Sequence, residues 1–200
     1  MGIGNVLWAD EGFGVRAVAA LNEAWRFPES VTLMDGGTQG LYLLPYVQDA
    51  RRILVFDAID YGLEPGTLQI VKDGDIPSYM GVGKMSLHQS SFQEVLSLAQ
   101  LSGRTPERAV LVGVQPKLLK DFGGSLTDVV RARLPEALAA GLQVLAEWGV
   151  AGTPRGPEDA APLFDTSLAI GNYEDGRPSA EAACRVGDER LLALRASLER

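Results

Sequence analysis

Short apolar runs alternate with segments of helical spacing along the first 150 residues, and this alternation leaves few folds open. The runs that indicate strands are Val31–Met34, Ile53–Phe56, Thr67–Val71 and Ala109–Val114. Strands that alternate with helices favour a mostly parallel sheet with helices on both faces. We therefore expect an α/β fold, in which ligands bind beyond the carboxyl ends of the strands.

The segments between these runs carry the apolar spacing of buried helical faces. Apolar residues recur every three or four positions at Val15, Val18, Leu21 and Trp25. Phe92, Val95, Leu96 and Ala99 follow the i, i+3, i+4, i+7 pattern of one helical face. Such spacing is typical of an amphipathic helix. Further helices are expected at Leu41–Ala50, Leu126–Arg133 and Pro135–Trp148.

The amino terminus raises a question about the first strand. The chain opens on Gly2-Ile3-Gly4-Asn5, a turn that should follow a strand in an α/β fold, and only Met1 stands before it. The first strand of a parallel sheet is usually central, so its loss would expose the edges of both neighbours. We expect that this strand is missing from the chain, and we favour a truncated start over a fold built without it.

Composition excludes several classes of function. A net charge of −8 and a pI near 4.7 disfavour nucleic-acid binding, because an acidic surface repels phosphate. The single cysteine, Cys184, cannot form an internal disulfide, which fits a reducing compartment. No apolar run approaches the roughly 18 residues of a membrane span, and no secretory signal opens the chain. We expect a soluble, cytoplasmic protein.

The texture of the sequence changes after Val150. Residues 152–159 have the composition of a linker, and residues 171–179 are again polar and rich in turn formers. A helix could form over Glu181–Leu198, but its apolar face would be thin. We therefore expect an α/β domain over residues 1–150 and an extension of low order over residues 151–200.

The only histidine, His88, follows Ser86, and Gln89 completes a capping-box pattern. His88 is thus expected in the first turn of a helix, where the positive end of the helix dipole disfavours imidazolium. Metal ligation needs the neutral imidazole. A surface histidine without a role is the open alternative.

Acidic residues stand at the same expected edge of the sheet. Asp57 ends a buried strand, where a charge without a partner is costly. Asp35 follows the preceding strand, and Glu11 lies between two glycine clusters, next to Asp10, which we interpret as a helix cap. A turn-forming role remains an alternative for Asp57. Two such carboxylates and an imidazole form a ligand set for nickel or zinc.

Other kinds of site are less well supported. A serine or cysteine triad would have to use His88, and no H-E-x-x-H motif of zinc proteases is present. The amino-terminal glycines do not match the dinucleotide fingerprint, because Leu7 stands where the third glycine belongs.

Together these blocks resemble the [NiFe]-hydrogenase maturation endopeptidases, over Gly2 to about Val150. The blocks are Gly2-Ile3-Gly4-Asn5, Asp10-Glu11-Gly12-Phe13-Gly14, Asp35-Gly36-Gly37-Thr38, Phe56-Asp57-Ala58, Ser86-Leu87-His88-Gln89 and Gly113-Val114-Gln115-Pro116. The match is closest to the branch that serves uptake hydrogenases, on Trp8-Ala9-Asp10-Glu11 and the eight residues from Asp35 to Tyr42.

The resemblance implies a three-layer fold with a twisted, mostly parallel five-stranded sheet. It implies an endopeptidase, classed as aspartic-type, that removes the carboxyl-terminal extension of the hydrogenase large-subunit precursor after nickel insertion. Glu11, Asp57 and His88 would contact the nickel, which the substrate carries and the enzyme does not keep. Asp57 and Asp35 would take part in cleavage. The precursor is the expected partner, with the enzyme acting as a monomer and with no nucleic acid or membrane.

Alternatives remain at this stage. Hydrolysis could use a nickel-activated water or an aspartate as base. The segment Asp73–Lys84 could be a flap over the substrate tail or an ordinary surface loop. A chaperone that senses nickel and binds the precursor without cutting it would need the same ligands. A hydrolase of small molecules or nucleotides is a second rival, although no phosphate loop is present.

Overall fold

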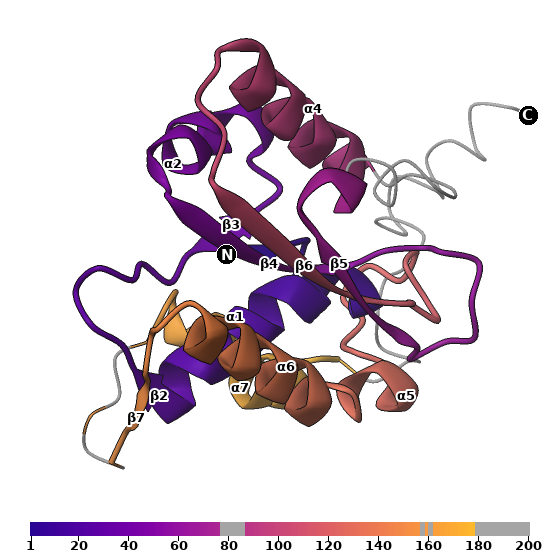
Figure 1. The fold of residues 1–200 in the computed structure, drawn as a ribbon. Helices are drawn as coiled ribbons and strands as arrows, with labels where there is room; N and C mark the ends of the chain where they lie inside the picture. Colours follow the sequence, from indigo (N-terminus) through magenta and orange to yellow (C-terminus); the bar gives the residue numbers. More distant parts are fainter. Residues whose placement is uncertain (77–86, 157–158, 160–161, 179–200) are drawn as a thin grey trace, which may run out of the picture.

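A five-stranded sheet forms the centre of the computed structural model, which describes residues 1–76, 87–156, 159 and 162–178 (Figure 1). Its strands, in the order in which they lie side by side, are β3 (Asp35–Gly37), β1 (Gly2–Ile3), β4 (Arg52–Ala58), β6 (Arg108–Val114) and β5 (Leu68–Lys72). All neighbours are parallel except β5, which runs antiparallel to β6. The expected α/β fold with a mostly parallel five-stranded sheet is confirmed.

Helices cover both faces of this sheet. One layer holds α1 (Phe13–Ala24) and α6 (Leu134–Glu147), and the other holds α2 (Leu44–Asp49) and α4 (Leu87–Leu101) (Figure 1). The remaining helices of the described residues are α5 (Asp128–Arg131), α7 (Ile170–Asp175) and four short 3-10 helices, Ala9–Gly12, Gly40–Leu43, Asp73–Asp75 and Thr166–Leu168. The helices expected from apolar spacing are all found, with ends shifted by a few residues.

The central strand β4 contributes to the core on both of its faces. Leu54, Phe56 and Ala58 belong to the apolar cluster of α1 and α6. Ile53 and Val55 belong to the cluster that contains Phe92, Val95 and Ala99 of α4. Because successive side chains of a strand point to opposite faces, Asp57 points to the layer of α2 and α4.

Two expectations about the sheet were wrong. Gly2 and Ile3 do not belong to a turn; they form a strand, which pairs with β3 on one side and with Phe56 on the other. The expected truncation of the chain stays a prediction. The second error concerns Val31–Met34, which precedes the strand β3 and is not part of it. Residues 31–33 have no strand beside them to pair with, because β1 is only two residues long. The pairing of the two segments begins with the hydrogen bond from the Gly2 N–H to the Met34 carbonyl.

Part of the chain beyond residue 150 lies against the helical layer. Thr153–Pro154 forms β7, which pairs antiparallel with β2 (Trp25–Arg26). Glu174 of α7 makes an ion pair with Arg131 and accepts a hydrogen bond from Ser125. The division at residue 150 stays a prediction, and residues 179–200, with Cys184, lie outside the described residues. None of the helices in the described part is long and apolar enough to cross a membrane.

Candidate active site

Close packing of glycines against the sheet fixes the loop that bears Glu11. Gly4 has a φ of +124°, and a Cβ there would lie 1.8 Å from the carbonyl oxygen of Glu11. A Cβ on Gly14 would lie 2.1 Å from the carbonyl oxygen of Phe56. Only glycine allows both approaches. Helix α1 and the 3-10 helix before it therefore lie directly against the carboxyl end of β4, beside Asp57.

Asp57 is the most perturbed carboxyl group of the described residues. Its side chain is 3% exposed, and its Oδ1 accepts a hydrogen bond of 2.8 Å from the N–H of Ala58. Its Oδ2 is buried and has no hydrogen-bond partner among the described residues. Burial raises the pKa of Asp57 to about 8, and the nearby charge of Glu11 adds to the rise. At pH 7 this carboxyl group is therefore mostly protonated when no cation is near.

Glu11 is half-buried, and burial raises its pKa as well. Two carboxyl groups that share a partly dry site repel each other once both are ionised. A divalent cation between them would remove this penalty. The pair therefore has the properties of an incomplete cation site.

Asp35 lies at the same edge of the sheet but is separated from β4 by β1. Gly2 pairs with Asp35 on one side and with Phe56 on the other. Burial raises the pKa of Asp35, whereas the backbone N–H of Gly37 and the charge of Arg16 lower it. Its Oδ1 is buried, and no described residue forms a hydrogen bond with it. The charge that perturbs Asp57 is that of Glu11, so the structure couples those two acids and places Asp35 beside Arg16.

His88 lies in the first turn of α4, as expected, because this helix begins at Leu87. Its side chain, the cap at Ser86 and residues 77–84 of the expected flap are outside the described residues. Helix α4 covers the face of the sheet to which Asp57 points. Within the described part of the chain, no group of three histidine, cysteine, aspartate or glutamate side chains could hold a metal ion. The proposed trio thus stays a prediction.

The sequence suggested that Asp10 caps α1. This prediction was wrong, because the residue at the N-cap position is Gly12. Its buried carboxylate instead binds the chain that follows β6. Oδ2 accepts hydrogen bonds of 2.9 Å from the N–H groups of Lys117 and Leu118. Oδ1 accepts one of 2.7 Å from the N–H of Thr127, whose hydroxyl donates to Oδ2 at 3.0 Å. Asp10 thereby holds the 3-10 helix of Glu11 against residues 117–127.

Gln115 is a second residue whose role sequence reasoning missed. Its Oε1 accepts hydrogen bonds from the N–H groups of Tyr61 and Leu63, at 2.7 and 3.1 Å. Its Nε2 donates to the Oδ1 of Asp60, which also accepts a hydrogen bond from the N–H of Gly62. Gln115 thus shapes the loop that follows Asp57. In the sequence, the block Gly113–Pro116 is recognisable only as part of the family resemblance.

Comparison with known proteins gives one consistent result. A family model described as hydrogenase maturation protease matches residues 15–144. A hydrogenase expression/formation protein, HupM of Azotobacter chroococcum, is 58% identical over 193 residues, which cover 96% of this chain and 92% of the relative. The HoxM protein of Cupriavidus necator is 54% identical and covers 96% of both chains.

Solved structures agree with these relatives. The hydrogenase maturating endopeptidase HybD from Escherichia coli superimposes with a TM-score of 0.73 at 37% identity, over 77% of this chain and 94% of that one. The solution structure of an endopeptidase from the same organism gives a TM-score of 0.72 at 36% identity, over 80% of this chain and 96% of the other.

Proposed function

Since this chain belongs to the hydrogenase maturation protease family, we propose that it removes the carboxyl-terminal extension of a [NiFe]-hydrogenase large-subunit precursor once nickel has been inserted. The names of the relatives support the maturation step, and the endopeptidase structures support hydrolysis of a peptide bond. The nickel belongs to the substrate and leaves with it. Action as a monomer in the cytoplasm is part of the same proposal.

One observation carries the nickel part of this proposal: the Oδ2 atom of Asp57 is buried at the carboxyl end of β4, and no group in the described part of the chain bonds to it. Such an orphaned acceptor is costly in a folded protein and calls for a ligand. A cation that arrives with the substrate would satisfy it and would also relieve the repulsion from Glu11. Carboxylate and imidazole ligands suit a borderline divalent metal such as nickel.

The raised pKa of Asp57 provides the proofreading step. A precursor without nickel meets a mostly neutral carboxyl group, because the pKa is about 8. A precursor with nickel favours the ionised form, so the proton leaves as the metal binds. Recognition of nickel is thus coupled to the charge of Asp57, one of the two catalytic candidates.

Two routes to hydrolysis fit this arrangement. Nickel could activate the attacking water, or Asp57 or Asp35 could remove its proton as a general base. Asp35 lies at the same edge of the sheet, and its buried Oδ1 has no hydrogen-bond partner within the residues that the structure describes. The aspartic-type class corresponds to the second route, and we keep both Asp57 and Asp35 as catalytic candidates.

Glu11→Gln is expected to weaken recognition of nickel more than it weakens the fold. The amide keeps the shape of the side chain but removes the charge that raises the pKa of Asp57. Processing of nickel-loaded precursor should fall by roughly 100-fold or more, as when a metal site loses a contributing group. Glu29→Gln, which changes an exposed glutamate, is the control and should process at the wild-type rate. An unaltered response to nickel in Glu11→Gln would move the role to another acid.

His88→Ala is expected to stop processing while the protein stays folded. The chain has no other histidine that could replace this imidazole. Processing should fall by roughly 100-fold or more, with Tm within about 2 °C of wild type. Gln100→Ala, at an exposed position of the same helix, should change neither quantity. Retained processing would remove His88 from the site.

A further inference from the structure

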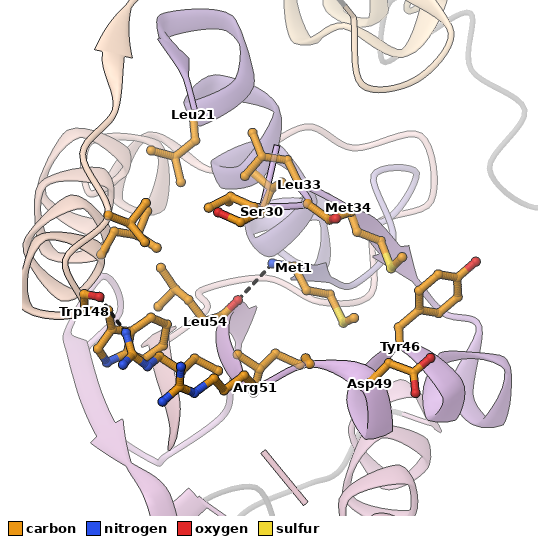
Figure 2. Close-up of a pocket in the computed structure, with 18 of the residues that line it drawn as sticks. Met1, Leu21, Ser30, Leu33, Met34, Tyr46, Asp49, Arg51, Leu54 and Trp148 are labelled. Carbon is orange, nitrogen blue, oxygen red and sulfur yellow. Dashed lines mark hydrogen bonds between the residues drawn. The ribbon is translucent and has the colours of Figure 1, made fainter. Parts of the chain in front are cut away.

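The two ends of strand β4 have different surroundings. Beside its amino end lies a cavity of about 880 Å³, with Leu21 and Trp148 on one side and Tyr46 on the other (Figure 2). Neither Asp57 nor Glu11 lines this cavity, which is therefore separate from the candidate active site. At the carboxyl end of β4, the space beside Asp57 is filled by a side chain to which no role has yet been assigned.

Gly113 is the neighbour of Asp57 in the sheet. The two residues are register partners in the parallel pairing of β4 with β6. Register partners project their side chains from the same face of a sheet, and neighbouring strands lie only about 4.8 Å apart. Because Gly113 has no side chain, it leaves the space next to the Asp57 carboxyl group open to another residue.

Tyr61 fills this space. A Cβ on Gly113 would lie 3.1 Å from the Cζ atom of Tyr61 and 3.3 Å from its Cε2 atom, and closer still to the hydroxyl oxygen. The Tyr61 side chain packs against the apolar cluster that contains Val55 and Leu111, on the face of the sheet to which Asp57 points. Its hydroxyl oxygen is buried. The hydroxyl group of Tyr61 therefore lies beside the Asp57 side chain, on the same face of the sheet.

The backbone of Tyr61 is held by the chain that follows β6. Gln115 accepts a hydrogen bond of 2.7 Å from the Tyr61 N–H and one of 3.1 Å from the Leu63 N–H. The same side chain donates to Asp60 at 3.0 Å. Gln115 thus fixes the start of the tyrosine side chain, and Gly113 receives its end. A functional group is placed accurately when neighbouring residues fix its side chain in this way.

We propose that Tyr61 is a positioning residue for Asp57, and that its hydroxyl group donates a hydrogen bond to the Oδ2 atom of the Asp57 carboxylate when substrate is bound. This inference rests on the proposed function. The Oδ2 atom is buried, and no described residue bonds to it. A carboxylate oxygen has two acceptor sites. Oδ2 can therefore accept from Tyr61 and still bind the cation that the substrate carries.

A tyrosine hydroxyl suits this task. The Ala58 N–H already bonds to Oδ1 of Asp57 at 2.8 Å, so a second donor on Oδ2 would fix the orientation of both carboxylate oxygens. The phenol is neutral, so it adds no charge that would compete with the substrate's cation. Hydrogen bonds to a charged acceptor are shorter and stronger than those between neutral groups. The hydroxyl group is thus expected to act on the rate of cleavage through Asp57.

Tyr61→Phe tests the hydroxyl group alone, because it keeps the ring and its packing. With nickel-loaded precursor, kcat should fall by about 10- to 100-fold, the range of one hydrogen bond to a charged group. KM should stay within about twofold of wild type, because the lost bond orients a reacting group and does not hold the substrate. Tm should stay within about 3 °C. Tyr46→Phe, which removes an exposed hydroxyl group, is the control and should leave kcat and KM unchanged.

Gly113→Ala tests the position of the hydroxyl group. The added Cβ would take the place of the hydroxyl oxygen, so the tyrosine side chain must turn away from Asp57. In the wild-type background, kcat should fall about as much as in Tyr61→Phe. In the Tyr61→Phe background there is no hydroxyl group to displace, so Gly113→Ala should lower kcat by no more than about twofold. Residues that act as one unit show this lack of additivity.

The outcomes separate this inference from the proposed function. A wild-type kcat in Tyr61→Phe, beside an active wild-type enzyme, would overturn the inference alone. Losses that multiply in the double variant would overturn it as well, because the two residues would then act independently. A fall in kcat that is matched by a large fall in Tm would assign Tyr61 to folding. If the wild-type protein did not cleave the nickel-loaded precursor, both the proposed function and this inference would be wrong.

Discussion

Asparagine in place of Asp57 is expected to abolish processing. The same substitution should make the fold increasingly stable relative to wild type as the pH rises. Asparagine keeps the oxygen that accepts from the Ala58 N–H but cannot ionise. It supplies no anionic ligand or base, so processing should fall by about 10³-fold or more, in the range seen when a catalytic group is removed. Intact-mass analysis of nickel-loaded precursor measures this loss.

The effect on stability follows from the direction of the pKa shift. The pKa of Asp57 is raised from 3.8 in the unfolded chain to about 8 in the folded one. Its proton therefore stabilises the fold fully below pH 4, and this contribution is lost as the pH rises towards 8. The loss amounts to about 1.4 kcal/mol per pH unit. Between pH 5 and pH 7, the stability of Asp57→Asn relative to wild type should therefore increase by about 2–3 kcal/mol.

Denaturant unfolding at pH 5, 6, 7 and 8 measures this difference. Asp175→Asn, at an exposed aspartate, is the control and should give the same difference from wild type at each pH. A constant difference for Asp57→Asn would mean that the Asp57 carboxyl ionises in the folded state as it does in water. Such a result would remove the coupling between nickel and proton on which the proofreading step depends.

Asp10→Ala is expected to cause the largest loss of stability among substitutions near the site. It leaves three buried or partly buried backbone N–H groups without an acceptor, those of Lys117, Leu118 and Thr127. Each such loss costs about 1–3 kcal/mol. Allowing for partial relaxation, the free energy of unfolding should fall by about 3–5 kcal/mol, and Tm by about 10 °C.

Two further variants make the Asp10 prediction specific. Asp10→Asn should also destabilise the fold. Its NH₂ group would replace one carboxylate oxygen and would then face an N–H group that now donates a hydrogen bond to that oxygen. Asp60→Ala removes the acceptor of one backbone N–H and one side-chain amide, in a less buried place. The free energy of unfolding should fall by about 1 kcal/mol. An Asp10→Ala protein as stable as Asp60→Ala would show that residues 117–127 keep their position without Asp10.

The sequence was sufficient for elements that depend on local pattern. The expected bounds lay within a few residues of the observed ones for α1, α4, β4 and β6. Each of these elements buries apolar side chains at a regular spacing that is visible within its own sequence. The edge strand β3 was harder to predict than the other edge strand, β5. Val31–Met34 has the composition of a strand, yet the pairing lies at Asp35–Gly37, because pairing depends on the length of β1, its neighbour in space.

The site shows the same division between local and distant causes. The position of Asp57 at a buried strand end could be predicted from the apolar run before it, and Glu11 was expected at the same edge of the sheet. The electrostatic coupling of the two acids came only from the structure. The role of Asp10 could not be predicted, because its partners lie more than a hundred residues further along the chain. No local spacing connects such residues; only the folded sheet brings them together.

The most direct test compares one precursor in two states, loaded with nickel and free of it, after incubation with this protein. Intact-mass spectrometry should show loss of the carboxyl-terminal extension from the nickel-loaded precursor only. Equal cleavage of both forms would contradict recognition of nickel. An unchanged mass for the nickel-loaded precursor, despite stable binding, would contradict the peptidase assignment and favour a chaperone that senses nickel.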